Sequence, residues 1–379
     1  PGITLIGGGV SLRDEIAWFD RRPLFGKRVG VTRASAQATG LRDALAELGA
    51  DIIELPALRI ERLDSAPLRA ALARLHEFTW VIFTSQNAVQ IAPDYADAWG
   101  AMAEAEELYS SYNLDSAPAA DARALAAAEH ALKLDPNCAS AYVAQGMVRA
   151  ARWQWAEADQ AFRRALALTP GDADAVNQYA QFFLATGQLD FAVTATARAQ
   201  RLDPLNQVNG VTRTYILYAL HRYDAAWAQL RSILAVYPDF FGARTDALNI
   251  AIALKRYPEI DKQARLYAPL IGLARDTFAQ VMRGLVDPSL HAHTVQNLET
   301  SSEFASLRDH PVIYASLLAQ LGERDQALDQ LERAVDRPDR IDPTLIWNPQ
   351  FDSVRDDPRF KAILEKMGLP YRSAANSAR

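Results

Sequence analysis

The stretch at residues 139–170, ASAYVAQGMVRAARWQWAEADQAFRRALALTP, decides the fold of this chain because its pattern returns further along the sequence. Its last residue, Pro170, is one of four prolines spaced 34 residues apart, the others being Pro136, Pro204 and Pro238. Apolar and small residues around these prolines repeat in the same register. A fixed period of this length is typical of supersecondary units that stack into an array.

Each unit is predicted to be a helix, a turn, a second helix and a stop. Proline ends the second helix because its ring removes a donor and disfavours helical geometry in the preceding residue. Large and small residues recur at two separate phases of the repeat, and we expect both sets to pack between neighbouring helices. The large set is Leu134, Leu168, Leu202 and Val236, and the small set is Ala158, Ala192 and Ala226.

The aromatic, small and proline positions of the first unit are occupied in order by Tyr142, Gly146, Ala158, Phe162, Ala165 and Pro170. These residues resemble the tetratricopeptide repeat, which implies a superhelix of helix pairs. The second unit keeps Gly187 in its turn, whereas the third has Ile233 at a small position and Arg213 at an apolar one. An earlier unit runs 43 residues from Pro93 to Pro136, and we expect its nine extra residues in a loop over 110–118.

Helices are predicted to continue after Pro238. We expect a first helix over 241–256, a helical pair within 258–285, and a further unit over 311–335 with Gly322 in its turn. The end of the chain, from residue 348 to 370, resembles the closing helix of bacterial repeat proteins. The predicted solenoid therefore covers residues 91–370, and residues 371–379 are predicted to form a disordered tail.

The first ninety residues have a different pattern, in which β-branched runs alternate with amphipathic segments. Strands are predicted at 28–32, 51–55 and 80–84, with helices at 36–48 and 67–76. Strands separated by helices of this length indicate right-handed crossovers and a parallel sheet. The fold class is therefore mostly α, a solenoid with a small N-terminal α/β segment.

This N-terminal part resembles uroporphyrinogen-III synthase, the enzyme that closes the linear tetrapyrrole hydroxymethylbilane. The matching stretches are RPLFGKRV at 22–29, VTR at 31–33, LGADIIELP at 48–56 and WVIFTSQNAV at 80–89. Residues 1–20 resemble the last strand and helix of uroporphyrinogen-III C-methyltransferase, which is often fused upstream of the synthase. The sequence does not start with Met, and we expect it to continue upstream.

The resemblance implies a site that is mostly missing. The synthase family has two α/β domains with substrate in the cleft between them, whereas this sequence leaves the pattern after Val89. We therefore expect no turnover by this chain alone. Substrate-binding candidates carried over from the resemblance follow the first and last strands: Thr32, Arg33, Thr84, Ser85 and Asn87. Strand ends opening onto helix N-termini suit a polycarboxylate, although the last three residues are equally explained as helix caps.

The predicted solenoid offers a second kind of site, because the first helix of each unit lines the concave wall where a peptide can lie. Repeat positions place Asn177, Gln181, Tyr215, Thr245 and Asn249 on that wall. Their uncharged polar character disfavours the carboxylate clamp used by some tetratricopeptide repeat proteins. Simple solvation of these side chains is the alternative explanation.

Other motifs favour structural explanations. Gly7-Gly8-Gly9 lacks the spacing of a nucleotide loop, and His291 and His293 lack further ligands at metal-binding spacing, so we expect neither cofactor nor metal. Trp153 and Trp155 flank the turn of the first unit, where core packing is favoured over a partner contact.

Charge and composition narrow the class of partner. A net charge of −6 disfavours nucleic acid, and no apolar run is long enough to span a bilayer. A single cysteine, Cys138, rules out an internal disulfide framework, and we expect a cytoplasmic protein.

Two functions of different class follow. The first is a scaffold whose repeat array binds a protein or peptide in its groove, with an inactive synthase-like segment. The second is a uroporphyrinogen-III synthase that takes hydroxymethylbilane when another chain completes its site. A third explanation is the artificial joining of two unrelated genes at Val89, Gln90 and Ile91.

Overall fold

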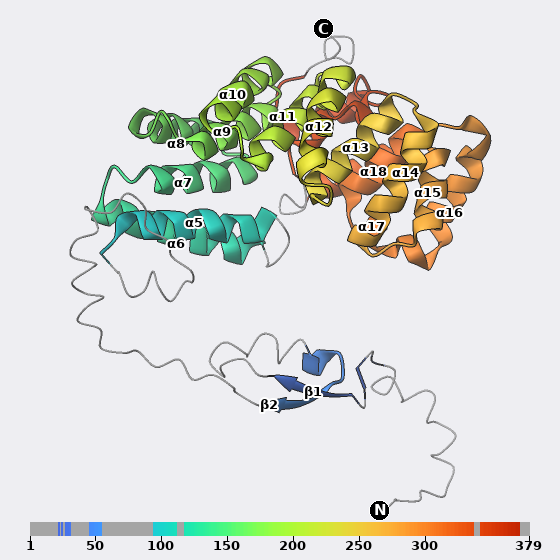
Figure 1. Cartoon of the computed structure of the whole chain (residues 1–379), viewed down its shortest axis with the longest axis horizontal. Helices are drawn as coiled ribbons and strands as arrows, with labels where there is room; N and C mark the ends of the chain where they lie inside the picture. The colour runs from blue at the N-terminus through green and yellow to red at the C-terminus, as the bar shows by residue number, and fades with distance from the viewer. Residues whose placement is uncertain are drawn as a thin grey trace, which may run out of the picture. The chain divides into compact units, whose positions relative to one another are not determined.

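The computed structural model describes residues 22, 24–25, 27–31, 45–54, 94–111, 117–336 and 342–371 (Figure 1). The chain divides into two units, Pro1–Val81 and Ile82–Arg379, and each is described by itself. The predicted segments 1–20, 67–76 and 80–84 lie outside the described residues, as does the predicted tail 371–379 except for Tyr371.

The described part of the N-terminal unit is a pair of parallel strands. β1 (Arg28–Val31) and β2 (Asp51–Glu54) pair with Arg28 opposite Asp51 and Val31 opposite Glu54. Residues 45–47, at the end of the predicted intervening helix, are helical, and Gly49 follows them at a φ of 89°. The prediction of two parallel strands in this segment is confirmed.

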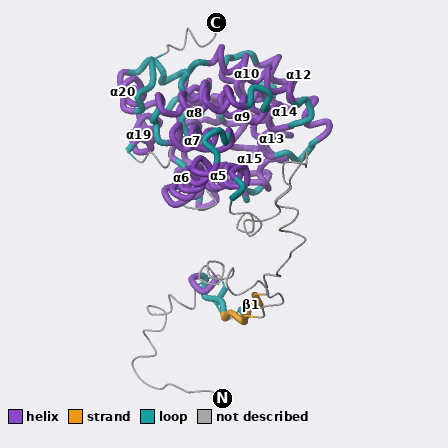
Figure 2. Tube along the Cα trace, turned by 90° about the vertical axis from the view of Figure 1, so that its left-hand side faces the viewer, coloured by secondary structure: helices purple, strands orange, loops and turns teal. Residues whose placement is uncertain are grey.

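The C-terminal unit is a series of antiparallel helix pairs, each packed on the next along the chain (Figures 1 and 2). The pairs run as α5 (Ala96–Ser111) with α6 (Ala117–Leu134), α7 (Ala139–Ala151) with α8 (Trp155–Leu168), α9 (Ala173–Ala185) with α10 (Leu189–Leu202), α11 (Gln207–Ala219) with α12 (Tyr223–Val236), and α13 (Phe241–Ala253) with α14 (Tyr257–Tyr267). The predicted α-solenoid of tetratricopeptide type is confirmed.

The 34-residue period is visible in the backbone itself. Trp153, Gly187, His221 and Lys255 stand 34 residues apart, and each has a positive φ, at 60°, 73°, 57° and 52° respectively. Each follows the first helix of its pair and turns the chain into the second. A left-handed residue after a helix end is the usual way to reverse direction, and glycine adopts it most easily. Only one of these four turns contains glycine.

Small residues allow the helices of a pair to approach closely. Ala158, Ala192 and Ala226 are fully buried, as predicted for the small set. Gly146 lies under the Phe162 ring, where an added Cβ would stand 2.8 Å from the ring atoms. These contacts leave no room for a larger side chain, so the spacing of small residues sets the distance between helices.

The third unit keeps this close packing by placing a large residue on the second helix opposite a glycine on the first helix. Ile233 takes the small position on α12, and the facing residue on α11 is Gly210, whose added Cβ would stand 3.0 Å from Ile233 Cδ1. The large residue that departs from the repeat pattern in this unit is therefore matched by a glycine on the partner helix.

The prediction that the large set packs between helices is wrong. Leu134, Leu202 and Val236 are exposed, at 37%, 42% and 67%. Each is the last residue of a second helix, as is Leu168. At this point the chain leaves the packed face, so the position recurs in the sequence without entering the core.

The loop predicted over residues 110–118 is also too wide. α5 continues to Ser111 and α6 begins at Ala117, with residues 112–116 outside the described part. α5 has 16 residues and α6 has 18, against 13 and 14 in the following pair. Much of the extra length in this unit therefore extends the helices, because its alanine-rich composition favours helix over turn.

The array continues beyond Pro238 as predicted, with additions. α15 (Arg275–Gly284) and the pair α18 (Pro311–Leu321) with α19 (Arg324–Val335) match predicted segments. Two helices between them, α16 (His291–Thr300) and α17 (Ala305–Arg308), were not predicted. Within the described residues, no helix is both long and apolar enough to cross a membrane.

Residues 342–371 form what we call the C-terminal segment. It contains the short 3₁₀ helices η7 (Leu345–Trp347) and η8 (Pro349–Phe351), then α20 (Pro358–Lys366), which is the predicted closing helix. Trp347, Phe351 and Phe360 are almost completely buried and share one hydrophobic core with residues of α9, α11 and α13. The C-terminal segment is therefore part of the folded array.

The left-handed turns predict a stabilising substitution. Lys255 is exposed and adopts a φ of 52°, which glycine reaches without the Cβ penalty. Lys255→Gly is expected to raise the free energy of unfolding by about 0.5–1 kcal/mol, after allowing for the greater unfolded-state entropy of glycine. Urea denaturation measures the change. Lys255→Ala is the matched control and should match wild type, because alanine keeps the Cβ; an equal gain with alanine would contradict the explanation.

Candidate interaction surfaces

The first helices α7, α9, α11 and α13 form one face of the array, which we call the inner face. The C-terminal segment lies against it through Trp347, whose Nε1 donates to the backbone oxygen of Ala185 at the end of α9 over 2.9 Å. The indole also covers Gly187, where an added Cβ would stand 2.7 Å from the ring. Gly187 therefore serves both the left-handed turn and the close approach of Trp347.

A buried arginine holds the C-terminal segment in shape. Arg355 is fully buried, and its Nη2 donates to the backbone oxygen of Asn348 over 2.8 Å while its Nη1 donates to that of Ile346 over 3.3 Å. Its Nε also donates to Asp352 over 3.2 Å. A buried charge needs such partners, and these bonds fix the backbone around η7 and η8.

Further contacts join this segment to the array. Asp352 Oδ2 lies 3.3 Å from Nε2 of His221, the left-handed residue of the third turn. Trp155 Nε1 donates to the backbone oxygen of Met367 over 2.7 Å. Trp155 and Trp153 are both partly buried and pack against the core, in agreement with the structural explanation of this pair.

Two of the five predicted groove residues meet the C-terminal segment. Asn249 Oδ1 accepts a hydrogen bond from Gln350 Nε2 over 3.1 Å. Tyr215 has a buried hydroxyl. Its pKa is raised well above the usual value, mainly by burial and to a smaller extent by the negative charge of Asp342. The C-terminal segment thus covers the inner face beside these two residues.

The other three predicted groove residues have local partners or are enclosed. Asn177 is 2% exposed, Gln181 donates to the side chain of Gln178 over 3.1 Å, and Thr245 donates to the backbone oxygen of Phe241 over 3.1 Å. Binding of a partner by the five residues stays a prediction.

Buried polar groups behind the inner face were not predicted. Asn209 on α11 and Asp246 on α13 are 0% and 4% exposed, and burial raises the pKa of the Asp246 carboxyl well above its usual value. The available signal was a carboxylate among apolar residues of the same helix face, at Ala243, Ala247 and Ile250. These three apolar residues pack in one cluster with residues of α11 and α12, and only that packing of helices, which the sequence does not show, decides that the face is buried.

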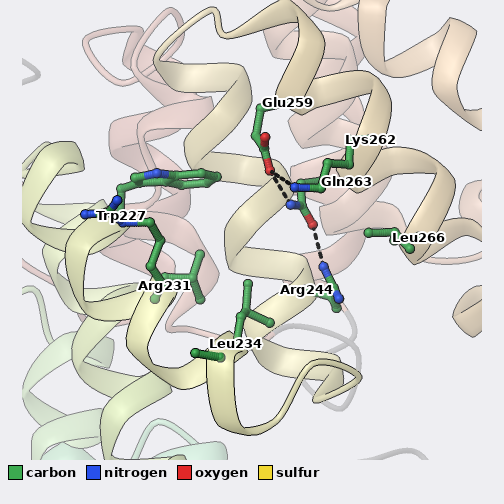
Figure 3. Close-up of a pocket in the computed structure, with 10 residues that line it drawn as sticks. Trp227, Arg231, Leu234, Arg244, Glu259, Lys262, Gln263 and Leu266 are labelled. Carbon is green, nitrogen blue, oxygen red and sulfur yellow. Dashed lines mark hydrogen bonds and ion pairs between the residues drawn. The ribbon is translucent and has the colours of Figure 1, made fainter.

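A separate hollow of about 480 Å³ lies between α12 and α14, the second helices of two consecutive pairs (Figure 3). One wall is a stripe of α12 at helical spacing, formed by Trp227, Leu230, Arg231, Leu234 and Ala235. The other wall is the corresponding stripe of α14, formed by Glu259, Lys262, Gln263 and Leu266. Arg244 of α13 reaches in between them. We call this the α12–α14 hollow.

A series of hydrogen bonds runs along the α14 side of the α12–α14 hollow. Arg244 Nη1 donates to Gln263 Oε1 over 2.9 Å, and Gln263 Nε2 donates to Glu259 Oε1 over 2.5 Å. Lys262 Nζ also lies 3.4 Å from the same Glu259 oxygen. Figure 3 shows this series of hydrogen bonds on one side and Trp227 with Arg231 on the other. The hollow thus contains three cationic side chains and only one carboxylate among its lining residues, and this carboxylate already accepts hydrogen bonds from Gln263 and Lys262.

A second hollow, of about 380 Å³, lies beside the C-terminal segment. Its walls include Trp155, Phe182 and Phe183 from α8 and α9, with Gly368 and Pro370 from the C-terminal segment. Asp159 and Arg163 at its edge already pair with each other over 2.7 Å. This hollow therefore combines aromatic side chains with polar ones, among them Thr186 and Gln188.

The candidate substrate residues of the N-terminal segment, Thr32, Arg33, Thr84, Ser85 and Asn87, lie outside the described residues. Their role in binding a polycarboxylate stays a prediction.

The helix pairs, the 34-residue turns and the two parallel strands define a helical-repeat protein that carries a separate α/β segment. Residues 40–160 match the family model described as uroporphyrinogen-III synthase HemD, which confirms the predicted resemblance. That match runs from the N-terminal segment through α5, α6 and α7 into α8. The boundaries of the predicted domains stay predictions.

Known proteins share parts of this chain. The Porphyrin biosynthesis protein HemD of Ruminiclostridium josui is 33% identical over 101 residues, which covers 26% of this chain and 20% of that protein. The Uroporphyrinogen-III C-methyltransferase of Bacillus subtilis is 34% identical over 90 residues, covering 24% of this chain and 18% of that protein. The chain thus spans about a fifth of the length of these relatives.

Among solved structures, a tetratricopeptide repeat protein from Parabacteroides merdae aligns with a TM-score of 0.46 at 14% identity, covering 71% of this chain and 99% of that one.

The buried carboxyl predicts a pH-dependent effect. Because burial raises the pKa of Asp246 in the folded state, the wild-type protein loses stability as pH rises above the unfolded carboxyl pKa of about 3.9. Asp246→Asn removes this penalty, so it should match wild type near pH 4 and gain stability progressively toward pH 8. Urea denaturation across this range measures it. The exposed Asp239→Asn is the control, and a pH-independent difference for Asp246→Asn would refute the explanation.

Proposed function

We propose that this chain is a protein-interaction scaffold whose repeat array holds a polypeptide partner. The observation that carries the proposal is the α12–α14 hollow, an amphipathic channel between two helices of a rigid stack. Arrays of helix pairs present extended surfaces on which neighbouring units contribute side chains to one partner. We propose the cytoplasm as its compartment, supported by the single cysteine of the sequence.

The contacts of the C-terminal segment support different roles for the two faces of the array: the inner face binds this segment, and the face formed by the second helices binds the partner. Trp347 and Gln350 already occupy α9 and α13 on the inner face, through hydrogen bonds to Ala185 and Asn249. A partner on that face has to displace buried aromatic residues, which costs several kcal/mol for each large side chain exposed. A partner in the α12–α14 hollow meets no such cost.

Crosslinking of the tagged full-length chain in its source cells tests the scaffold. We expect enrichment of a protein partner over a tag-only control, with crosslinks in residues 94–371 and binding reproduced by the two purified proteins. Asn177→Ala with Gln181→Ala serves as the inner-face variant, and loss of capture by it would assign the partner to that face. Absence of any enriched protein, or crosslinks confined to residues 1–90, would disprove the scaffold function.

A second candidate function is uroporphyrinogen-III synthase activity completed by another chain. It is favoured by the family match over residues 40–160 and by the parallel pairing of β1 with β2. The catalytic geometry of such an enzyme depends on groups from both of its domains, so a partial segment needs a complement.

Incubation of the purified chain with hydroxymethylbilane tests this second candidate, with the type III ring scored against the spontaneous type I ring. The chain alone is expected to give only the spontaneous product, and type III ring above background would establish synthase activity. Thr84→Ala with Ser85→Ala is then the variant expected to lower the type III yield, whereas an unchanged yield would remove these two residues from the site.

A further inference from the structure

The α12–α14 hollow is lined by more cationic than anionic side chains, in a chain of net negative charge. The whole chain carries a net charge of −6, yet Arg231, Arg244 and Lys262 face this hollow with Glu259 as its one acidic lining residue. Since surface charge of one sign in a hollow raises the local concentration of ligands of the other sign, this lining favours anionic ligands.

The cations differ in how far they are already engaged. Among the described residues, Arg231 makes no hydrogen bond or ion pair, and Arg244 uses only Nη1, on Gln263. Gln263 is 3% exposed and is held in turn by Glu259, so Arg244 is fixed in position before any ligand arrives. A fixed guanidinium with unused donors is suited to carboxylates, because less side-chain entropy is lost on binding.

The apolar side chains that line the hollow place a second requirement on a ligand, which must also present apolar groups. Trp227, Leu234 and Leu266 flank the cations, and Leu230 closes the α12 wall from the core side. Arg256 of the next turn stacks on the Trp227 ring at 5.5 Å and also pairs with Asp224, which holds the indole in place. A ligand must therefore combine apolar groups with negative charge.

The shape favours a peptide over a compact small molecule. The two walls are helix stripes over residues 227–235 and 259–266, which are about 10–12 Å long at 1.5 Å per residue. The hollow is a channel between two neighbouring helices, into which an amphipathic segment can lay one apolar face. Acidic side chains on both flanks of that segment then reach Arg231 on one wall and Lys262 on the other.

We propose that the α12–α14 hollow binds an acidic amphipathic segment of a partner protein, with leucine or aromatic side chains between Trp227 and Leu266 and carboxylates on Arg231, Arg244 and Lys262. This inference rests on the proposed scaffold function and names the face and the class of partner.

Two synthetic peptides test the inference by calorimetry with the full-length chain. One carries leucine and phenylalanine along one helical face and glutamate on both flanks, and its twin has lysine in place of glutamate. The acidic peptide should bind at least about tenfold more tightly than the twin, and added salt should weaken it. Equal affinity for the two peptides, or binding of neither, would overturn the inference.

Variants of the hollow locate the binding. Arg231→Glu with Lys262→Glu is expected to weaken the acidic peptide by at least about tenfold and to improve binding of the lysine twin. The milder Arg231→Gln with Lys262→Gln, which removes charge without reversing it, should give an intermediate loss. The matched control is Lys133→Glu with Arg333→Glu, two exposed cations outside the hollow, and it should leave affinity within about twofold. Thermal melting verifies that each variant is folded.

The outcomes separate this inference from the scaffold proposal. A partner captured equally by wild type and the charge-reversed variant would keep the scaffold and remove the hollow as its site. Acidic-peptide binding with no captured partner would keep the hollow and remove the scaffold function. Binding of anionic vesicles or of an oligonucleotide through Arg231 and Lys262, without binding of the acidic peptide, would overturn the inference.

Discussion

Close contact between paired helices is the constraint on which this array depends. Each helix buries only one stripe of its surface, so it is stable only against a neighbour at short distance. Ala158, Ala192 and Ala226 provide that distance, and Gly210 restores it where Ile233 takes the small position. Because every unit has the same requirement, the same sizes return every 34 residues, and the stack continues as long as the register does.

The C-terminal segment ends the stack by a different means. A solenoid leaves its last apolar surfaces without a following unit, and here residues after α19 turn back across the first helices. Trp347 and Arg355 give this segment a defined conformation, one through apolar burial and a hydrogen bond to Ala185, the other through bonds to the segment's own backbone. The inner face beside Ala185 and Asn249 is thereby covered, while the α12–α14 hollow between second helices stays open to ligands.

Local patterns explain which parts of the structure were predictable. Helix pairs, their stops and the strands β1 and β2 follow from periodicity and from turn residues, which act over a few positions. The large set ending in Val236 shows the limit of that reasoning. A residue can recur at a fixed position of the repeat because each helix ends there and not because it is buried. Only the packed structure distinguishes these two cases. The left-handed turns at Trp153, His221 and Lys255 were likewise missed, because only glycine marks such a turn in sequence.

By itself, the sequence determined the repeat, its 34-residue register and the two-part character of the chain, including the resemblance of its N-terminal segment to uroporphyrinogen-III synthase. The tertiary structure alone decided which faces of the array are open. Trp347 meets Ala185 across 162 positions of sequence, and Gln350 meets Asn249 across 101. No periodic pattern encodes such pairs, since they depend on where a long chain returns in space. The same holds for the α12–α14 hollow, whose cations come from three helices and act together only once those helices are packed.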